Sequence, residues 1–324
     1  MKVGLFVNTQ FPEGYDLAAR VPEMVAQVGA AREAGFASLW LPHHWLTQPM
    51  QMLQITPVMG YLAALAEGMT IGPNILILPP LNPVHVAEEA ATLDVLTGGR
   101  YILGLGLGYR EPEFEAFGVP LSERAPRFNE SIGLMRRLWT EDRVTHQGRF
   151  YQVTDAGLGA RPVRAGGPPL YIAGFAPPAV KRAARIGDAW LIMNNGLGTV
   201  APLMRTYRDA LQEYGRTPAE YPITVECYVG AQHATAQEEC REPLEYKYNA
   251  YAAWGMGDLP PQSFADLARD RFIIGDKVSV KEEIARYREL LGVDHFIMRC
   301  QWPGLPQERV LDSIKRLGEI FASL

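Results

Sequence analysis

Short apolar runs alternate with longer segments of helical period along the chain. In the first of these longer segments, Val21, Met24, Val25 and Val28 fall on one face of a helix. The strand-like runs lie at residues 3–7, 38–41, 71–78, 101–107, 170–173, 189–193, 223–229 and 295–299. Eight strands that alternate with helices predict a parallel α/β protein, and the count favours a closed (β/α)8 TIM barrel over an open doubly wound sheet.

Turn signals set the ends of the predicted helices. Asn82 followed by Pro83 gives an N-cap with a first-turn proline, and Thr56 with Pro57 repeats the signal. Residues 141–169 are rich in glycine, arginine and threonine and break the alternation, so we expect a loop or a hairpin there. A long, partly helical region, residues 235–291, separates the last two strands. Further helices are predicted at residues 123–139, 177–186, 200–214 and 306–324.

The composition is that of an ordinary globular protein. The 324 residues are 48% hydrophobic and 21% charged, which excludes a disordered chain, a collagen and a coiled coil. No apolar stretch approaches the roughly 20 residues of a membrane-spanning helix, and the N-terminus lacks the features of a signal peptide. A net charge of -5 implies no basic surface for nucleic acid. Three cysteines without metal-ligand spacing agree with a reduced, cytoplasmic setting.

Candidate chemistry should follow the strands, because function in a (β/α)8 barrel lies in the loops at the strands' C-terminal ends. His43 and His44 stand beside Trp45 after the second strand. An imidazole can exchange a proton near neutral pH, and at most one of two adjacent side chains should face a pocket. A surface histidine stacked on Trp45 is the competing interpretation. A metal site on this fold would typically use a His-x-His pair, and the sequence contains none, so no metal is predicted.

Three further segments that follow strands could receive a ligand. Asn74 is polar inside an apolar run, so its amide needs hydrogen-bond partners if it is buried. Gly104 and Gly106 share one face of the fourth strand, where they leave room for a flat ring or for close packing against a neighbouring strand. The turn after the fifth strand opens a helix, and backbone N–H groups at such an end can hold a phosphate, although an ordinary loop is the competing interpretation. That turn consists of Gly174, Phe175 and Ala176.

With these residues in place, the chain resembles the bacterial luciferase-like flavin-dependent monooxygenases over nearly its whole length. The likeness is densest at residues 40–44, 78–88, 99–118 and 171–188, and segment 299–304 is similar to flavin-dependent members. The resemblance implies one TIM-barrel domain over residues 1–324. It also implies a long insertion between strands 7 and 8, at about residues 230–276, as a possible active-site lid. The resemblance suggests a homodimer, with a tetramer as the alternative, and with helices of the N-terminal half at the interface.

The resemblance also implies roles for individual residues. The family's catalytic histidine maps to His43, with Pro42 where the family usually has glutamate. A non-proline cis peptide that supports the flavin ring is expected between Asn74 and Ile75. Gly106 stands where luciferase has a cysteine near the ring, and Tyr109 would form an apolar wall. The residues expected to bind the cofactor are Asn74, Ile75, Gly106, Tyr109, Gly174, Phe175 and Ala176, the last three as the phosphate turn.

The resemblance implies a monooxygenation as the reaction. Reduced FMN would come from a separate flavin reductase, O2 would add to it as a peroxyflavin, and a small organic substrate would be oxidised while His43 moves a proton. Tyr246, Tyr248, Tyr251 and Trp254 would belong to the lid. Segment 299–304 favours FMN over the family's other cofactor, the deazaflavin F420, which transfers hydride without oxygen. A non-catalytic flavin-binding protein and a metal-dependent hydrolase on the same barrel are further alternatives.

Overall fold

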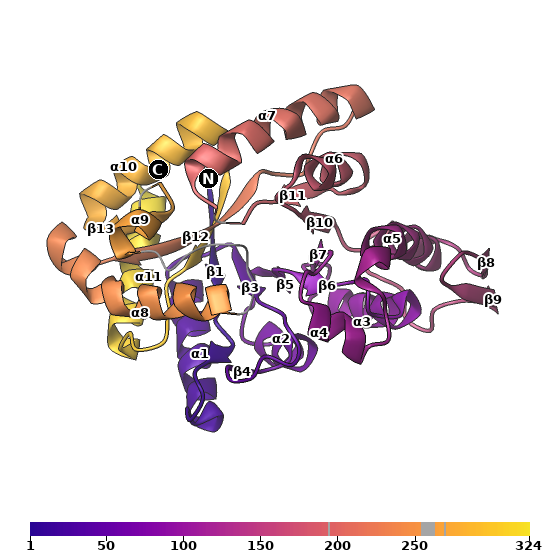
Figure 1. Ribbon diagram of the computed structural model, residues 1–324, viewed down its shortest axis with the longest axis horizontal. Coiled ribbons are helices and arrows are strands. Elements are labelled where there is room, and N and C mark those ends of the chain that lie inside the picture. Colours follow the sequence, from indigo (N-terminus) through magenta and orange to yellow (C-terminus); the bar gives the residue numbers. More distant parts are fainter. Residues whose placement is uncertain (194, 254–262, 269) are drawn as a thin grey trace.

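The computed structural model describes residues 1–193, 195–253, 263–268 and 270–324, and its parallel strands form a closed barrel (Figure 1). Regular ladders join most neighbouring strands, and the bridges Ile71–Tyr101 and Ile192–Ile223 close the two remaining gaps. The predicted (β/α)8 barrel is therefore confirmed. In order around the ring, its strands are β1 (Lys2–Phe6), β3 (Ser38–Leu41), β5 (Thr70–Pro73), β7 (Leu103–Gly106), β10 (Leu170–Ala173), β11 (Ala189–Leu191), β12 (Pro222–Val229) and β14 (His295–Arg299).

The third barrel strand differs from the continuous run predicted at residues 71–78. It is divided into β5 and a short β6 (Leu76–Ile77), and β6 pairs with β7. The peptide bond between Asn74 and Ile75, in the interruption, is cis, as the resemblance implies. The apolar pattern continues through the interruption, so the pattern alone could not locate it.

Helices cover the outside of the barrel (Figure 1). The side chain of Asn82 accepts a hydrogen bond from Val84 N at 2.9 Å, so the predicted N-cap is confirmed. The second helix instead begins before the predicted cap, at Ile55, and Thr56 donates its hydroxyl to Glu89. The helices are α1 (Leu17–Glu33), α2 (Ile55–Ala63), α3 (Pro83–Leu96), α4 (Glu111–Ala116), η1 (Leu121–Glu123), α5 (Arg124–Thr140), α6 (Pro177–Ile186), α7 (Leu197–Tyr214), α10 (Lys277–Leu291) and α11 (Gln307–Ala322).

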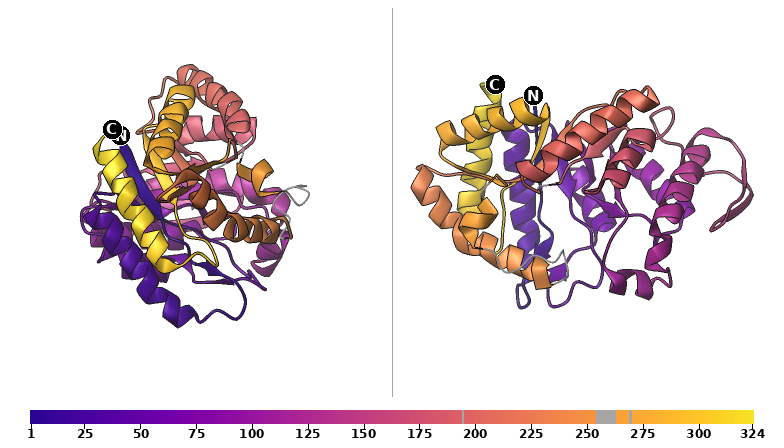
Figure 2. Two further views of the ribbon diagram at one scale, coloured as in Figure 1. Left: turned by 90° about the vertical axis from the view of Figure 1, so that its left-hand side faces the viewer. Right: turned by 45° about the horizontal axis from the view of Figure 1, so that its top comes forward.

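Two antiparallel pairs stand outside the barrel. Strands β8 (Val144–Gln147) and β9 (Gln152–Ala156) form a hairpin that extends beyond α5, so the hairpin alternative for residues 141–169 holds (Figure 1). Strands β2 (Gln10–Phe11) and β4 (Gln51–Met52) pair the segments that follow β1 and β3. The chain ends lie side by side, next to the contact of α11 with β1 (Figure 2). Over the described residues, no helix combines the length and the hydropathy needed to cross a lipid bilayer.

A long insertion separates the seventh and eighth barrel strands. It holds α8 (His233–Ala253), α9 (Phe264–Ala268) and β13 (Phe272–Gly275). The sequence analysis expected a partly helical region here, without bounds for its helices, and did not expect β13. Strand β13 pairs with residues 226–229 of β12, whereas β14 pairs with residues 222–226. Because the insertion follows the C-terminal end of β12, it begins at the functional end of the barrel.

The opposite end of the barrel is closed by a buried polar network. His295 lies with Nε2 2.7 Å from Ser38 Oγ and with Nδ1 2.6 Å from Glu220 Oε1. These contacts have the chemistry of a serine, histidine and carboxylate triad. However, Ser38 Oγ is fully buried and accepts a hydrogen bond from Trp40 Nε1. The network lies at the N-terminal end of the strands, where the fold gains stability, so His295 has a structural role.

Candidate active site

His43 is buried where the chain leaves β3 at the functional end of the barrel. Its Nδ1 accepts a hydrogen bond from Ile77 N at 3.2 Å, and its ring packs edge-on against Trp45 with centroids 4.1 Å apart. Burial, reinforced by the neighbouring His44, lowers the pKa of His43 to about 3. The imidazole is therefore neutral near pH 7. Since Nδ1 is an acceptor, we assign the proton to Nε2.

Glu113 in α4 fixes the loop that carries His43. Its Oε1 accepts hydrogen bonds from His44 Nδ1 at 2.9 Å, from Trp45 N at 2.9 Å and from Arg110 Nη1 at 3.1 Å. Burial alone would raise the pKa of Glu113. Its hydrogen bonds with His44 and Trp45, together with the charge of Arg110, outweigh burial and hold the pKa below its usual value. The two adjacent histidines thus point in different directions, as expected: His44 binds Glu113, and His43 binds Ile77 N.

The sequence analysis missed Glu113 because α4 was not predicted. One available signal was the group of charged residues 110–115 directly after the fourth strand. If a carboxylate of this group is buried, it needs a charged partner, and Arg110 is the neighbouring cation. In the structure, Glu113 is fully buried and lies against Arg110, whose guanidinium also donates to the carbonyls of Trp45 and Leu46.

The glycines of the fourth strand serve close packing. A Cβ atom at Gly104 would lie 2.0 Å from Pro73 O, and one at Gly106 would lie 2.6 Å from Ile75 Cδ1. Both glycines thus allow close packing, and the contact of Gly106 with a cofactor stays a prediction. Because Gly106 has no side chain, the side chain of Ile75 can pack directly on it and cover this face of β7. Ile75 is the residue that follows the cis peptide bond.

Asn74 spans the barrel interior. Its Nδ2 donates to Thr224 Oγ1 on β12 at 2.7 Å, whereas its Oδ1 is buried without a hydrogen-bond partner among the residues described. A buried amide oxygen without a partner is uncommon in a folded protein and is a contact point for a ligand donor. Tyr109, after β7, is 38% exposed and lies edge-on to His44. Both residues therefore border the same end of the barrel as His43.

The turn predicted to hold phosphate has the expected backbone. A Cβ atom at Gly174 would lie 2.4 Å from Ala179 Cβ, so glycine is required for the close approach of α6. Helix α6 begins with two prolines, which lack N–H groups, so Phe175 and Ala176 supply the donors at this end. Neither amide makes a hydrogen bond within the described parts of the chain. The side chain of Phe175 is 45% exposed. Phosphate binding here stays a prediction.

The aromatic residues predicted for the lid lie in different surroundings. Tyr251 donates its hydroxyl to Gln10 Oε1 at 2.7 Å and so joins α8 to the segment after β1. Tyr248 packs against Phe272 of β13, and Tyr246 is 46% exposed. Trp254 lies outside the described residues. Tyr246 also donates its hydroxyl to Met50 Sδ at 3.9 Å, so Tyr246 and Tyr251 both contact segments that follow barrel strands.

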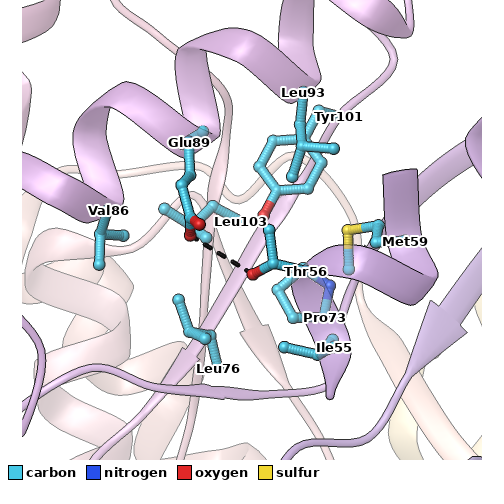
Figure 3. Close-up of a pocket in the computed structure, with 11 residues that line it drawn as sticks. Ile55, Thr56, Met59, Pro73, Leu76, Val86, Glu89, Leu93, Tyr101 and Leu103 are labelled. Carbon is cyan, nitrogen blue, oxygen red and sulfur yellow. Dashed lines mark hydrogen bonds between the residues drawn. The ribbon is translucent and has the colours of Figure 1, made fainter. Parts of the chain in front are cut away.

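A small cavity lies outside the barrel, between α2, α3 and the outer faces of β5 and β7 (Figure 3). Thr56 and Glu89 face one another in it at 3.3 Å among apolar side chains. Its volume of about 10 Å³ is room for roughly one water molecule, so it is no ligand site. Separately, no three histidine, cysteine or acidic side chains among the described residues are grouped to hold a metal ion.

Comparison with known proteins identifies the family. The model of the luciferase-like monooxygenase family matches residues 1–295, and the chain belongs to that family. It is 30% identical over 310 residues to an F420-dependent glucose-6-phosphate dehydrogenase of Amycolatopsis mediterranei, covering 89% of this chain and 91% of that protein. Identity to the enzyme of the same name from Microbacterium testaceum is 31%, covering 90% and 92%. The monooxygenase RslO1 of Streptomyces bottropensis shares the fold, with a TM-score of 0.88, 21% identity and coverage of 100% and 99%.

These relatives correct the predicted reaction. The expected monooxygenase that uses reduced FMN and O2 is wrong, because the curated relatives at about 30% identity are dehydrogenases that depend on F420. The monooxygenase RslO1 shows the fold alone at its lower identity. O2 and a separate flavin reductase, which the FMN mechanism required, have no support. The deazaflavin alternative from the sequence analysis is the better one.

Proposed function

We propose that the protein is an oxidoreductase that transfers hydride between the deazaflavin F420 and a small organic alcohol or its carbonyl product. The observation that carries this proposal is the 30–31% identity, over about nine-tenths of both chains, to F420-dependent dehydrogenases. The family assignment supports a flavin-type cofactor, and its relatives support hydride transfer as the reaction.

The residues at the functional end fit a tricyclic cofactor. Ile75 presents an apolar surface over Gly106, and the unpaired Oδ1 of Asn74 could accept a hydrogen bond from an N–H of the ring. The amides of Phe175 and Ala176 could hold its phosphate. All these residues follow β5, β7 and β10, which are consecutive around the barrel. When bound, a deazaflavin supplies a ring carbon that accepts or releases hydride.

His43 acts as a neutral hydrogen-bond donor in this proposal. Its Nδ1 is occupied by Ile77 N–H, so the free position of the ring is Nε2–H. That group would donate a hydrogen bond to the carbonyl oxygen of the substrate and orient the adjacent carbon for hydride transfer, and in the direction of alcohol oxidation the hydroxyl proton would leave to water. Burial lowers the pKa of His43 to about 3 and so keeps the ring neutral near pH 7, while the proton transfer expected of His43 from the family resemblance stays a prediction.

We also propose that the insertion, residues 230–276, covers the substrate and limits access of water. The expected homodimer has a candidate surface on α2 and α3, where Tyr61, Val95 and Leu96 expose large apolar side chains. These two helices pack against each other, so the apolar residues belong to neighbouring elements of the N-terminal half. A cytoplasmic location stays a prediction.

Hydride transfer can be tested directly by anaerobic spectroscopy. The protein is mixed with oxidised F420 and a panel of small primary, secondary and cyclic alcohols, and loss of the deazaflavin absorbance is followed. Reduction of F420 without O2 supports the proposal. The His43→Ala variant should still bind F420 but reduce it far more slowly. The contrary result is that F420 binds, but no alcohol reduces it and no matching carbonyl compound oxidises its reduced form. That result would point instead to a non-catalytic binding protein.

A further inference from the structure

A buried group of charged residues lies at the functional end, on the side formed by β12, β14 and β1. Glu226 is at β12, Arg299 ends β14, and Lys247 reaches them from α8. Their exposed fractions are 5%, 7% and 4%. Lys247 Nζ is paired with Glu226 Oε1, and Glu226 Oε2 accepts a hydrogen bond from Trp302 Nε1. We name Glu226, Lys247, Arg299 and their partners Asn8, Gln10 and Tyr251 the rim cluster.

The rim cluster has an excess of positive charge. When Lys247 is protonated, two cations face one carboxylate among the described residues, because Asn8 and Gln10 carry no charge. Neither Lys247 nor Arg299 has a second acidic partner among the described residues. A buried charge without a counter-charge is costly, so such groups are normally paired. Among the residues that the structure describes, the rim cluster thus lacks one counter-charge, which an anionic ligand would supply.

The rim cluster also has an excess of hydrogen-bond donors. Arg299 donates from Nη2 to Asn8 Oδ1 at 2.7 Å and from Nη1 to Tyr251 OH at 3.2 Å. The hydroxyl of Tyr251 in turn donates a hydrogen bond to Gln10 Oε1. Arg299 Nε and Gln10 Nε2 are both buried and find no acceptor within the described part of the chain. These are two donors in one connected network, and the oxygens of an anion can accept from both.

The rim cluster lies across the barrel from the proposed cofactor residues. The latter follow β5, β7 and β10, whereas the cluster belongs to β12, β14 and β1. The hydrogen bond from Asn74 to Thr224 joins the two sides, since Thr224 precedes Glu226 by two residues and shares its face of β12. A substrate between the two sides could touch the cofactor with one end and the rim cluster with the other.

We propose that the rim cluster binds an anionic oxygen group of the substrate, a carboxylate or a phosphate monoester, through Arg299 and Gln10. Only the assignment of this anion to the substrate rests on the proposed function; anion binding itself does not. The state of Lys247 supports it. Burial and the charge of Arg299 lower the pKa of Lys247 to about 7, although Glu226 opposes this. A bound anion would raise this pKa, so binding near pH 7 would take up a proton.

The test measures anion binding by the full-length protein without cofactor. Acetate, inorganic phosphate and the neutral acetamide are titrated, and the thermal midpoint and calorimetric heat are recorded. At least one anion should bind and stabilise the protein, whereas acetamide should not. Acetate and phosphate separate the two chemical classes. The Arg299→Gln variant should bind the preferred anion about 10- to 100-fold more weakly, as expected for loss of a charged hydrogen bond.

Lys277→Gln is the matched control, because it removes one cation from an exposed pair with Glu319 and should leave anion binding unchanged. If Arg299→Gln does not fold, Gln10→Glu provides a second test. It places a carboxylate in the network that connects Gln10 to Arg299 through Tyr251, so it should abolish anion binding. The proposal is overturned if neither anion binds, or if Arg299→Gln or Gln10→Glu binds as well as the unmodified protein. Displacement of the anion by F420 would assign the site to the cofactor and overturn the substrate assignment. None of these results depends on hydride transfer.

Discussion

The protonation state of His43 can be measured through the acid stability of the protein. The pKa of His43 is about 3 in the folded protein and about 6.5 when unfolded. Below the higher value, the unfolded chain binds a proton that the folded protein does not, so the free energy of unfolding falls as the pH decreases. The slope is about 1.4 kcal/mol per pH unit, so between pH values of about 6.5 and 4.5 His43 removes about 2.7 kcal/mol of stability.

The perturbation is His43→Asn, in which Oδ1 can replace Nδ1 as the acceptor for Ile77 N–H but cannot titrate. Urea unfolding is measured for both proteins at about pH 7 and about pH 4.5. We expect the loss of stability on acidification to be about 2.7 kcal/mol smaller in the variant, because all other groups contribute equally to both. His43→Gln should behave in the same way. An equal loss in both proteins would show that His43 is protonated in the folded state, and the assignment of a neutral donor would be refuted.

Two further changes test the supports of the site. Glu113→Ala removes a buried carboxylate that accepts hydrogen bonds from His44, Trp45 N and Arg110, so urea unfolding should show a loss of about 3–5 kcal/mol. The exposed Glu111→Ala should lose less than about 0.5 kcal/mol, and similar losses in the two variants would contradict the role of Glu113. Gly106→Ala places a methyl group 2.6 Å from Ile75 Cδ1, so Ile75 must move and F420 should bind less tightly in a fluorescence titration. Unchanged affinity would show that Ile75 does not support the ring.

Much of the fold could be predicted because the alternation of apolar runs and helical segments is regular. Helix α6 begins and ends at the predicted residues, and Asn82 caps α3 as its side chain and the following proline indicate. Strand β13 was missed because it lies in a region of mixed pattern, and it forms by pairing with the far end of β12, a contact that local sequence does not encode.

The site could be predicted only in part, because its key contacts join distant segments. His43 was found from its place after a strand, but its hydrogen bond to Ile77 and its neutral state depend on packing. The preference for FMN rested on segment 299–304. In the structure, Arg299 and Trp302 of that segment contact Tyr251 and Glu226, on the side away from β5 and β7. The segment therefore could not report on the cofactor ring.

The most direct test of the account is a binding titration of the purified protein with F420 and with FMN, in oxidised and reduced forms, followed by fluorescence without oxygen. We expect F420 to bind more tightly than FMN, because the relatives that share about 30% identity with this chain are F420-dependent. The tighter binding of F420 should weaken in Gly106→Ala. Tighter binding of FMN, or no binding of F420 in either redox state, would contradict the proposed function.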